Sequence, residues 1–260
     1  MSHPPSDVAL LDVLALEQLD RDLHRSRVLL EEPHPLYGGQ VFAQALLAAA
    51  ASVPQGRLPH SAHGYFLRPG DSGRPVVFAV ERDRDGRSFS ARRVVARQHG
   101  EVILNLSASF HEAEADAPDE AGIPVPVAPG TLEVSRPHRL VGVEQRLVHQ
   151  PHVTWPTQAW MRCLEPMPDD PALHAAVLAY LSDMNTGLGS LASSRHRDLS
   201  TLDHTVWFHR PVRADLWMLM DLQARAVSEG RGLYTGAIWT EDGVLAASLA
   251  QESLYRLRKG

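Results

Sequence analysis

Hydrophobic residues in this chain follow two periods, which predict two kinds of element. Residues 38–53 are apolar on almost every face of a helix, and residues 169–184 are apolar at helical spacing. Such helices are buried by surrounding elements and do not lie at the surface. The second segment also starts with Asp170 and Pro171, an N-cap residue followed by the residue favoured at the first helical position. We therefore predict one buried helix in each segment.

Most of the remaining chain alternates apolar and polar residues, which is the period of half-buried β-strands. The alternation is clearest in residues 74–111 and 216–258. Residue pairs that favour turns interrupt both stretches, at Asp85-Gly86, His99-Gly100, Glu229-Gly230 and Asp242-Gly243. We therefore predict several antiparallel strands after each helix.

The two halves of the chain repeat one another. Three matches occur in the same order: residues 65–69 with 207–211, residues 85–87 with 229–231, and Gly100 with Gly243, each glycine leading into an apolar strand. A repeat of this length indicates a duplicated domain and not a solenoid unit. We predict an N-terminal domain at residues 1–111 and a C-terminal domain at residues 133–260. The acidic, Pro/Ala-rich residues 112–132 have no period and are interpreted as the linker.

Composition and charge exclude several classes of protein. The 260 residues are 44% hydrophobic and 22% charged, with a formal net charge of −6, which gives no reason to expect a nucleic-acid partner. No apolar run has the length of a membrane span, and the N-terminal residues lack the basic region of a signal peptide. The lone Cys163 cannot form an intramolecular disulfide and is typical of a reducing compartment. We expect a cytoplasmic protein without membrane insertion.

Six motifs occur in order between residues 11 and 256: LYGGQVFAQAL, HSAHGYFLRPGD, DGRSFSARRVVA, LAYLSDMN, STLDHTVWFHRP and DGVLAASLAQES. Together they resemble the type II acyl-CoA thioesterases, a family of double-hotdog enzymes. The resemblance implies an α+β fold, a tandem double hotdog in which two antiparallel sheets each wrap a central helix. It also implies an acyl-CoA substrate hydrolysed to free acid and CoA, no cofactor or metal, and a homo-oligomer formed through sheet edges.

The resemblance assigns catalysis to Asp183, Thr201 and Gln251, here called the polar triad. A thioester is already activated, so an acid, a hydroxyl and an amide that orient water can hydrolyse it without a covalent nucleophile. The first half lacks such a set, because Thr201 matches a position near Pro59, Gln251 matches Ser109, and the first helix has no acid at the place of Asp183. We expect the first half to form the wall of the pocket.

Glycines and histidines at other conspicuous positions leave weaker hypotheses. Gly38-Gly39 could present backbone N–H groups to an anion, or could be required by a tight turn. His60 and His63 point to opposite faces of a strand, so we predict no metal site there. The sequence GLGSLA at residues 187–192 follows a helix and not a strand, which argues against dinucleotide binding.

Two other functions stay open at this point. A non-catalytic acyl-CoA-binding protein would keep the fold, although the presence of the whole polar triad argues against it. A hotdog enoyl-CoA hydratase would use an Asp/His pair such as Asp203-His204, but the usual Gly-Asp-x-Asn-Pro context is missing. Neighbours on a strand point to opposite faces, so this pair is divided, whereas Thr201 and Asp203 are expected to share a face. We interpret Asp203 as a structural acid.

Overall fold

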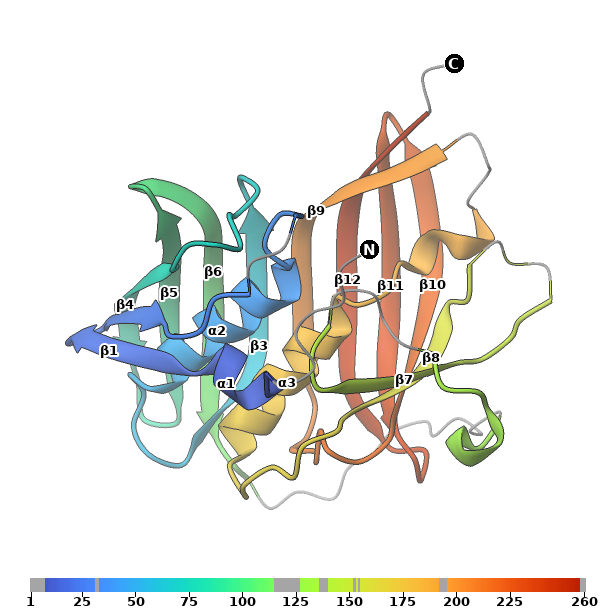
Figure 1. Ribbon diagram of the computed structural model, residues 1–260. Helices are drawn as coiled ribbons and strands as arrows, with labels where there is room; N and C mark the ends of the chain where they lie inside the picture. The colour runs from blue at the N-terminus through green and yellow to red at the C-terminus, as the bar shows by residue number, and fades with distance from the viewer. Residues whose placement is uncertain are drawn as a thin grey trace.

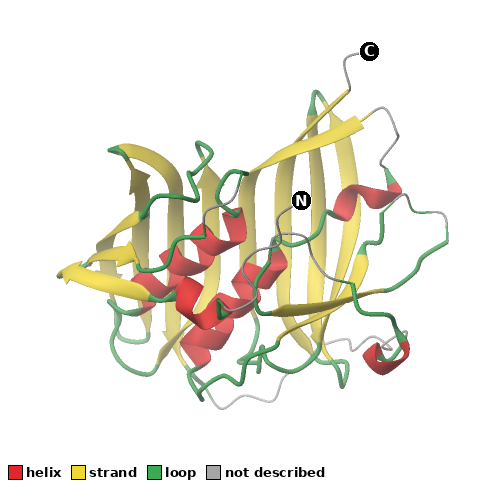
Figure 2. Cartoon of the chain, viewed as in Figure 1, coloured by secondary structure: helices red, strands yellow, loops and turns green. Residues whose placement is uncertain are grey.

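A computed structural model describes residues 8–30, 33–114, 127–135, 140–151, 153, 155–191 and 196–257. These residues form one strongly curved antiparallel sheet of twelve strands, with the helices on a single face of it (Figures 1 and 2). The elements of the first half are α1 (Leu10–Leu14), β1 (Leu16–Asp20), β2 (Leu23–Ser26), α2 (Gly38–Ala50), β3 (Arg57–Phe66), β4 (Val77–Asp85), β5 (Phe89–Gln98) and β6 (Glu101–Glu112).

The second half repeats this series of elements. It contains the 3-10 helix η1 (Pro129–Thr131), β7 (Val143–Leu147), β8 (Gln158–Cys163), α3 (Pro171–Ser182), the 3-10 helix η2 (Gly187–Ser190), β9 (His196–Phe208), β10 (Met218–Ser228), β11 (Arg231–Thr240) and β12 (Leu245–Leu257). The strand order is β1-β2-β4-β5-β6-β3-β9-β12-β11-β10-β8-β7, so each half has the same order read outward from the centre. The predicted double hotdog is confirmed, and its two sheets are continuous.

The halves join where β3 pairs with β9. In this pairing His63 lies opposite Thr205, and Ser61 lies opposite Trp207. The motif match makes His63 and Thr205 equivalent residues of the two halves, because Tyr65 corresponds to Trp207. Equivalent residues that face each other across an antiparallel pair mark a pseudo-two-fold axis, as in the interface of a symmetric dimer.

Both predicted helices are present, and their first turns differ. The side chain of Asp170 accepts hydrogen bonds from the backbone nitrogens of Ala172 and Leu173, which caps α3 as the sequence predicts. The N-cap of α2 is Tyr37, whose side chain does not cap the helix. Tyr37 instead donates from its hydroxyl to the carbonyl oxygen of Tyr180, at 2.8 Å, and packs edge-on against that ring. This contact ties the start of α2 to the end of α3.

The predicted turns close two of the hairpins with left-handed residues. His99 and Gly100 have φ of 51° and 79°, and Glu229 and Gly230 have φ of 49° and 77°. Positive φ at both central residues is the geometry of a tight hairpin turn whose twist matches the strands. The local turn chemistry therefore fixed the β5–β6 and β10–β11 connections.

A pair of equivalent β-bulges corrects one of the sequence matches. The pairing register skips Ile103 in β6 and Ala246 in β12, so these two residues are counterparts. Counting the same distance along each strand makes Gln251 the counterpart of Ala108. The match of Gln251 with Ser109 is therefore wrong by one residue, because the connection before β12, residues 241–244, is longer than the connection before β6, residues 99–100. The conclusion that the first half lacks the amide is unaffected.

Part of the domain division lies outside the described residues. Residues 115–126 of the predicted linker 112–132 are not described, so the domain limits of 1–111 and 133–260 remain predictions. Within the described residues, no helix has both the length and the apolar composition needed to cross a membrane.

Candidate active site

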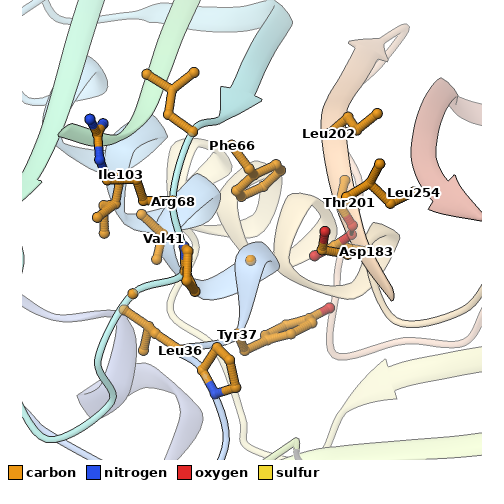
Figure 3. Close-up of a pocket in the computed structure, with 16 residues that line it drawn as sticks. Leu36, Tyr37, Val41, Phe66, Arg68, Ile103, Asp183, Thr201, Leu202 and Leu254 are labelled. Carbon is orange, nitrogen blue, oxygen red and sulfur yellow. Dashed lines mark hydrogen bonds between the residues drawn. The ribbon is translucent and has the colours of Figure 1, made fainter. Parts of the chain in front are cut away.

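A cavity of about 670 Å³ opens between the two halves of the chain and is here called the main cavity. Figure 3 shows Tyr37, Val41 and Phe66 of the first half on one side, with Asp183 and Thr201 of the second half on the other. Most of the first-half lining is apolar, as expected of a surface that accommodates hydrocarbon. The lining residues from β3 and the loop after it include Phe66, Leu67, Arg68, Pro69 and Gly70.

Asp183 is the residue at which α3 ends. It forms the C-cap, where the negative end of its own helix dipole disfavours a carboxylate. The start of α2 lies beside it, because a Cβ placed on Gly38 would stand 2.8 Å from Oδ2 of Asp183. The positive end of the α2 dipole therefore faces the carboxylate and offsets the unfavourable field of α3. Two antiparallel helices together create a place for this acid.

The structure brings the polar triad together. Thr201 Oγ1 donates to Oδ1 of Asp183 at 3.4 Å, and Gln251 Nε2 donates to Thr201 Oγ1 at 2.9 Å. Asp183 and Thr201 line the main cavity, whereas Gln251 is 4% exposed and lies behind Thr201. Residues from three separate parts of the sequence thus form one hydrogen-bonded chain that ends at the cavity wall.

A β-bulge in β9 decides which residues face this site. The pairing of β9 with β12 skips Leu202, so Thr201 pairs with Ser253 and Asp203 pairs with Glu252. The extra residue places Thr201 on the same side of the sheet as His204, and both contact the end of α3. The expectation that Thr201 and Asp203 share a face is therefore wrong.

The Asp203-His204 pair is divided, as predicted. His204 is fully buried beneath the helices, where its Nε2 lies 2.7 Å from Oγ of Ser182. Asp203 accepts a hydrogen bond from the backbone nitrogen of Glu252, at 2.9 Å. Burial lowers the pKa of His204 to about 4, and the neighbouring carboxamide of Gln251 offsets only part of this effect. The imidazole is therefore neutral at physiological pH, and it lies on the opposite face of β9 from Asp203, so the two side chains do not form the acid–base pair of a hydratase.

Gly38 and Gly39 are required by close packing and not by a turn. Neither residue is among the described glycines with positive φ. A Cβ on Gly39 would lie 2.7 Å from the carbonyl oxygen of Tyr180, and one on Gly38 would lie 3.1 Å from Cε1 of Phe66. The absence of side chains lets the first turn of α2 approach Asp183 directly, and Gly38 lines the main cavity.

A second, smaller cavity lies at the place that the pseudo-two-fold axis relates to the main cavity. It measures about 410 Å³ and is lined by Leu58 and Pro59 of β3 and by the segment Phe208 to Val212. Pro59 takes the place of Thr201 there. The adjacent start of α3 is capped by Asp170, so its first N–H groups already have acceptors. The duplication kept the shape of a pocket and changed its chemistry.

Sequence reasoning set aside one residue that belongs to this cluster. His204 lies beside Gln251 in the pairing of β9 with β12. From the sequence, His204 was considered as part of the Asp203-His204 pair and was given no role when that pair was rejected. The available signal was the difference between the halves, because the bulges at His60 and Leu202 make Ala62 the counterpart of His204. Among the described residues, no group of three or more His, Cys, Asp or Glu side chains could hold a metal ion.

The chain is matched by family models and by single proteins of known class. The family models described as acyl-CoA thioesterase N-terminal domain and acyl-CoA thioesterase C-terminal domain match residues 32–111 and 113–255. Acyl-coenzyme A thioesterase 8 of Mus musculus is 35% identical, over 96% of this chain and 90% of its own length. Acyl-CoA thioesterase 2 of Haemophilus influenzae is 32% identical, over 95% of this chain and 96% of its own length.

Solved structures extend the match to the whole fold. The acyl-CoA thioesterase II TesB2 of Mycobacterium marinum has a TM-score of 0.81 and 37% identity, covering 96% of this chain and 98% of that one. The tesB protein of Mycobacterium avium subs paratuberculosis has a TM-score of 0.83 and 31% identity, covering 95% and 98%. The chain belongs to the type II acyl-CoA thioesterase family. It is therefore an acyl-CoA thioester hydrolase, as the motifs predicted.

Proposed function

We propose that this enzyme hydrolyses acyl-CoA by direct attack of a water molecule oriented by Asp183, Thr201 and Gln251. The observation that supports the proposal is the hydrogen-bonded chain from Gln251 through Thr201 to Asp183, which ends at the wall of the main cavity. An acyl thioester needs a positioned water and donors for the developing oxyanion, and needs neither a covalent nucleophile nor a cofactor.

Each group has a defined task in the reaction. The carboxylate of Asp183 takes a proton from the water as the water oxygen bonds to the thioester carbonyl carbon. The hydroxyl of Thr201, held by the donor Nε2 of Gln251, keeps that water beside the carboxylate. When the tetrahedral intermediate collapses, the C–S bond breaks and the proton on Asp183 passes to the departing thiolate. The products are a carboxylic acid and the CoA thiol.

The first half supplies the remaining requirements. The N–H groups of Gly38 and Gly39 at the start of α2 have no acceptors within the helix, and Gly38 lines the main cavity. They are placed to donate to the oxygen that becomes negative in the intermediate. The acyl chain would lie against the apolar wall formed by Leu36, Val41, Phe66 and Ile103. The second half thus activates water while the first half binds the acyl group.

A single-turnover experiment in H₂¹⁸O tests direct attack by water. With enzyme in excess over acyl-CoA, direct attack places ¹⁸O in the released acid in the first turnover. Attack by the Asp183 carboxylate would instead expel the CoA thiolate and form a mixed anhydride, and attack of water on the aspartyl carbonyl of that anhydride would release acid carrying an unlabelled oxygen of the enzyme and leave the label in Asp183. Mass spectrometry of the acid and of the Asp183 peptide distinguishes the two, and unlabelled acid would disprove the proposal.

Location and assembly remain predictions. The cytoplasmic location and the homo-oligomer follow from the sequence and the family resemblance. Among the described strands, β1 and β7 are the two edges of the sheet, where another copy can pair. Light scattering coupled to size-exclusion chromatography would measure the mass of the protein in solution. The mass of a monomer at all concentrations would contradict the predicted oligomer.

A further inference from the structure

His204 lies at the centre of the buried part of the site, although it does not reach the cavity. It is fully buried, pairs with Gln251 across β9 and β12, and packs edge-on against Phe42 of α2 with ring centroids 5.2 Å apart. Its Nε2 lies 2.7 Å from Oγ of Ser182, the residue before Asp183. The imidazole therefore stands between the carboxamide of Gln251 and the helix end that carries Asp183.

The duplicated half shows that the fold does not need this histidine. Both halves have the same bulge in the equivalent strand, at His60 in β3 and at Leu202 in β9. Yet Ala62 occupies the place of His204 and is also fully buried. The residue opposite it is Ala108, where the second half has Gln251. Histidine and glutamine thus occur together in the half that carries the triad, and two alanines occur together in the other.

The direction of the hydrogen bonds in the triad constrains the carboxamide of Gln251. A carboxylate only accepts hydrogen bonds, so the single hydroxyl hydrogen of Thr201 points to Asp183. Thr201 Oγ1 then accepts, and its donor is Nε2 of Gln251 at 2.9 Å. The carboxamide must therefore keep its nitrogen toward Thr201 and its oxygen toward His204. A rotated amide would compete with Asp183 for the threonine hydrogen.

The imidazole can hold the amide in that orientation. Oε1 of Gln251 and Nδ1 of His204 are both buried, and neither has a hydrogen-bond partner among the described residues. The neighbouring carboxamide also favours the protonated imidazole, as an oxygen facing a ring N–H does. The hydroxyl of Ser182 donates to the carbonyl oxygen of Ala179 at 2.8 Å and also lies 2.7 Å from Nε2, whose role depends on the tautomer. The proposal requires the single hydrogen of this hydroxyl to point to Nε2 instead. A neutral ring that accepts at Nε2 carries its hydrogen on Nδ1, toward Gln251.

We propose that His204 is a positioning residue, which presents its Nδ1–H to Oε1 of Gln251 and so fixes the carboxamide that orients Thr201 toward Asp183. The inference rests on the proposed function of the triad. His204 touches neither substrate nor water in this scheme. Its effect reaches the reaction only through the orientation of Gln251, so its loss should lower kcat and leave KM little changed.

Two substitutions at His204 separate this role from packing. His204→Asn keeps a donor at the place of Nδ1, whereas His204→Gln keeps a polar group at the place of Nε2 and fills more of the space. We expect His204→Gln to lower kcat by about 10²-fold, the loss typical of a misplaced reacting group, and His204→Asn to retain most of it. A packing role predicts the reverse order, because the larger side chain leaves the smaller void. Equal or reversed losses would overturn the inference.

A double-substitution cycle with Gln251→Ala distinguishes failure of this inference from failure of the proposed function. If His204 acts through Gln251, the double variant His204→Gln/Gln251→Ala is no slower than Gln251→Ala alone. If the double variant loses kcat by the product of the two single losses, the inference is overturned and the proposed role of the triad is unaffected. A Gln251→Ala enzyme with normal kcat would overturn the proposed role of Gln251 and the inference with it. Thermal unfolding of each variant shows whether it is folded.

The tautomer of the unsubstituted protein gives a measurement that needs no variant to be stable. Nitrogen NMR of ¹⁵N-histidine-labelled protein reports which ring nitrogen carries hydrogen. We expect His204 to carry it on Nδ1. A hydrogen on Nε2 would overturn the inference, because Nδ1 would then be an acceptor facing the oxygen of Gln251.

Discussion

Gly38 and Asp183 belong to different halves of the chain, and a Cβ on Gly38 would stand 2.8 Å from Oδ2 of Asp183. The same Cβ would lie 3.1 Å from Cε1 of Phe66, so neighbours restrict it on two sides. Real Cβ atoms do not approach an oxygen this closely. The first half therefore determines the position of an acid that the second half supplies.

Gly38→Ala should lower activity without unfolding the protein. The methyl group must displace the Asp183 carboxylate, whose position sets the attacking water, so we expect kcat to fall by about 10²-fold. Free-thiol release from acyl-CoA measures the effect. Gly130→Ala is the matched control, because no atom of the described residues lies within 4 Å of a Cβ there. Equal activity of Gly38→Ala and Gly130→Ala would contradict the close approach of Gly38 to the Asp183 carboxylate.

Asp183→Asn should remove the general base and leave the fold intact. We expect kcat to fall by about 10²- to 10⁴-fold, the usual contribution of a positioned base. Asp203→Asn serves as the control, since Asp203 accepts from the backbone of Glu252 on the opposite face of β9. Loss of turnover in Asp203→Asn with activity kept in Asp183→Asn would reverse our assignment.

Thr201→Ser should keep most of the activity, and Thr201→Ala should lose it. Serine retains the hydroxyl that accepts from Gln251 and donates to Asp183, whereas alanine leaves the carboxamide nitrogen without its acceptor. We expect about a 10²-fold lower kcat for alanine. Thr205→Ala, which removes a hydroxyl facing His63 across the centre of the sheet, should be neutral. Comparable kcat values for Thr201→Ala and Thr205→Ala would refute the role of the hydroxyl.

The folded protein should lose stability as pH falls from about 6.5 to about 4, in part through His204. Burial holds the pKa of His204 near 4, while in the unfolded chain it returns to its ordinary 6.5. Between these values the unfolded state binds the extra proton, so the free energy of unfolding is highest above 6.5 and decreases toward 4. The full difference corresponds to roughly 3 kcal/mol.

Urea unfolding at several pH values measures this contribution. His204→Asn should show a shallower loss of the free energy of unfolding with acid, because its side chain does not titrate. His24, His60, His63 and His174 also have pKa values lowered by burial, and they remain in both proteins. Their effect cancels in the comparison. Parallel pH profiles for the two proteins would contradict a neutral buried His204.

Local sequence was sufficient for the two buried helices, for the strands that follow them and for the family. Helix α3 begins where Asp170 and Pro171 predict, because a cap satisfies backbone groups within its own turn. The hairpin at His99-Gly100 follows from residues that tolerate positive φ. Ordered motifs along the chain likewise placed Asp183, Thr201 and Gln251 in one family pattern. Their roles remain proposals.

Strand alternation was insufficient where a bulge interrupts it. A bulge depends on how two strands pair, and the partner of Leu202 lies in β12, far along the sequence. The bulge turned Thr201 to the same face as His204, and a longer turn before β12 moved the match of Gln251 from Ser109 to Ala108. Neither shift leaves a mark in the local pattern of apolar and polar residues.

By itself, the sequence determined the two buried helices and the strands after each of them, that this series occurs twice, and which three polar groups the family pattern selects. Only the tertiary structure decided that Asp183 meets the first turn of α2 at Gly38, and that His204 lies behind Gln251. The reason is physical. Helix caps and turns are satisfied within a few residues, whereas a site built across a pseudo-two-fold axis depends on strand register and helix packing between segments that are distant in the chain.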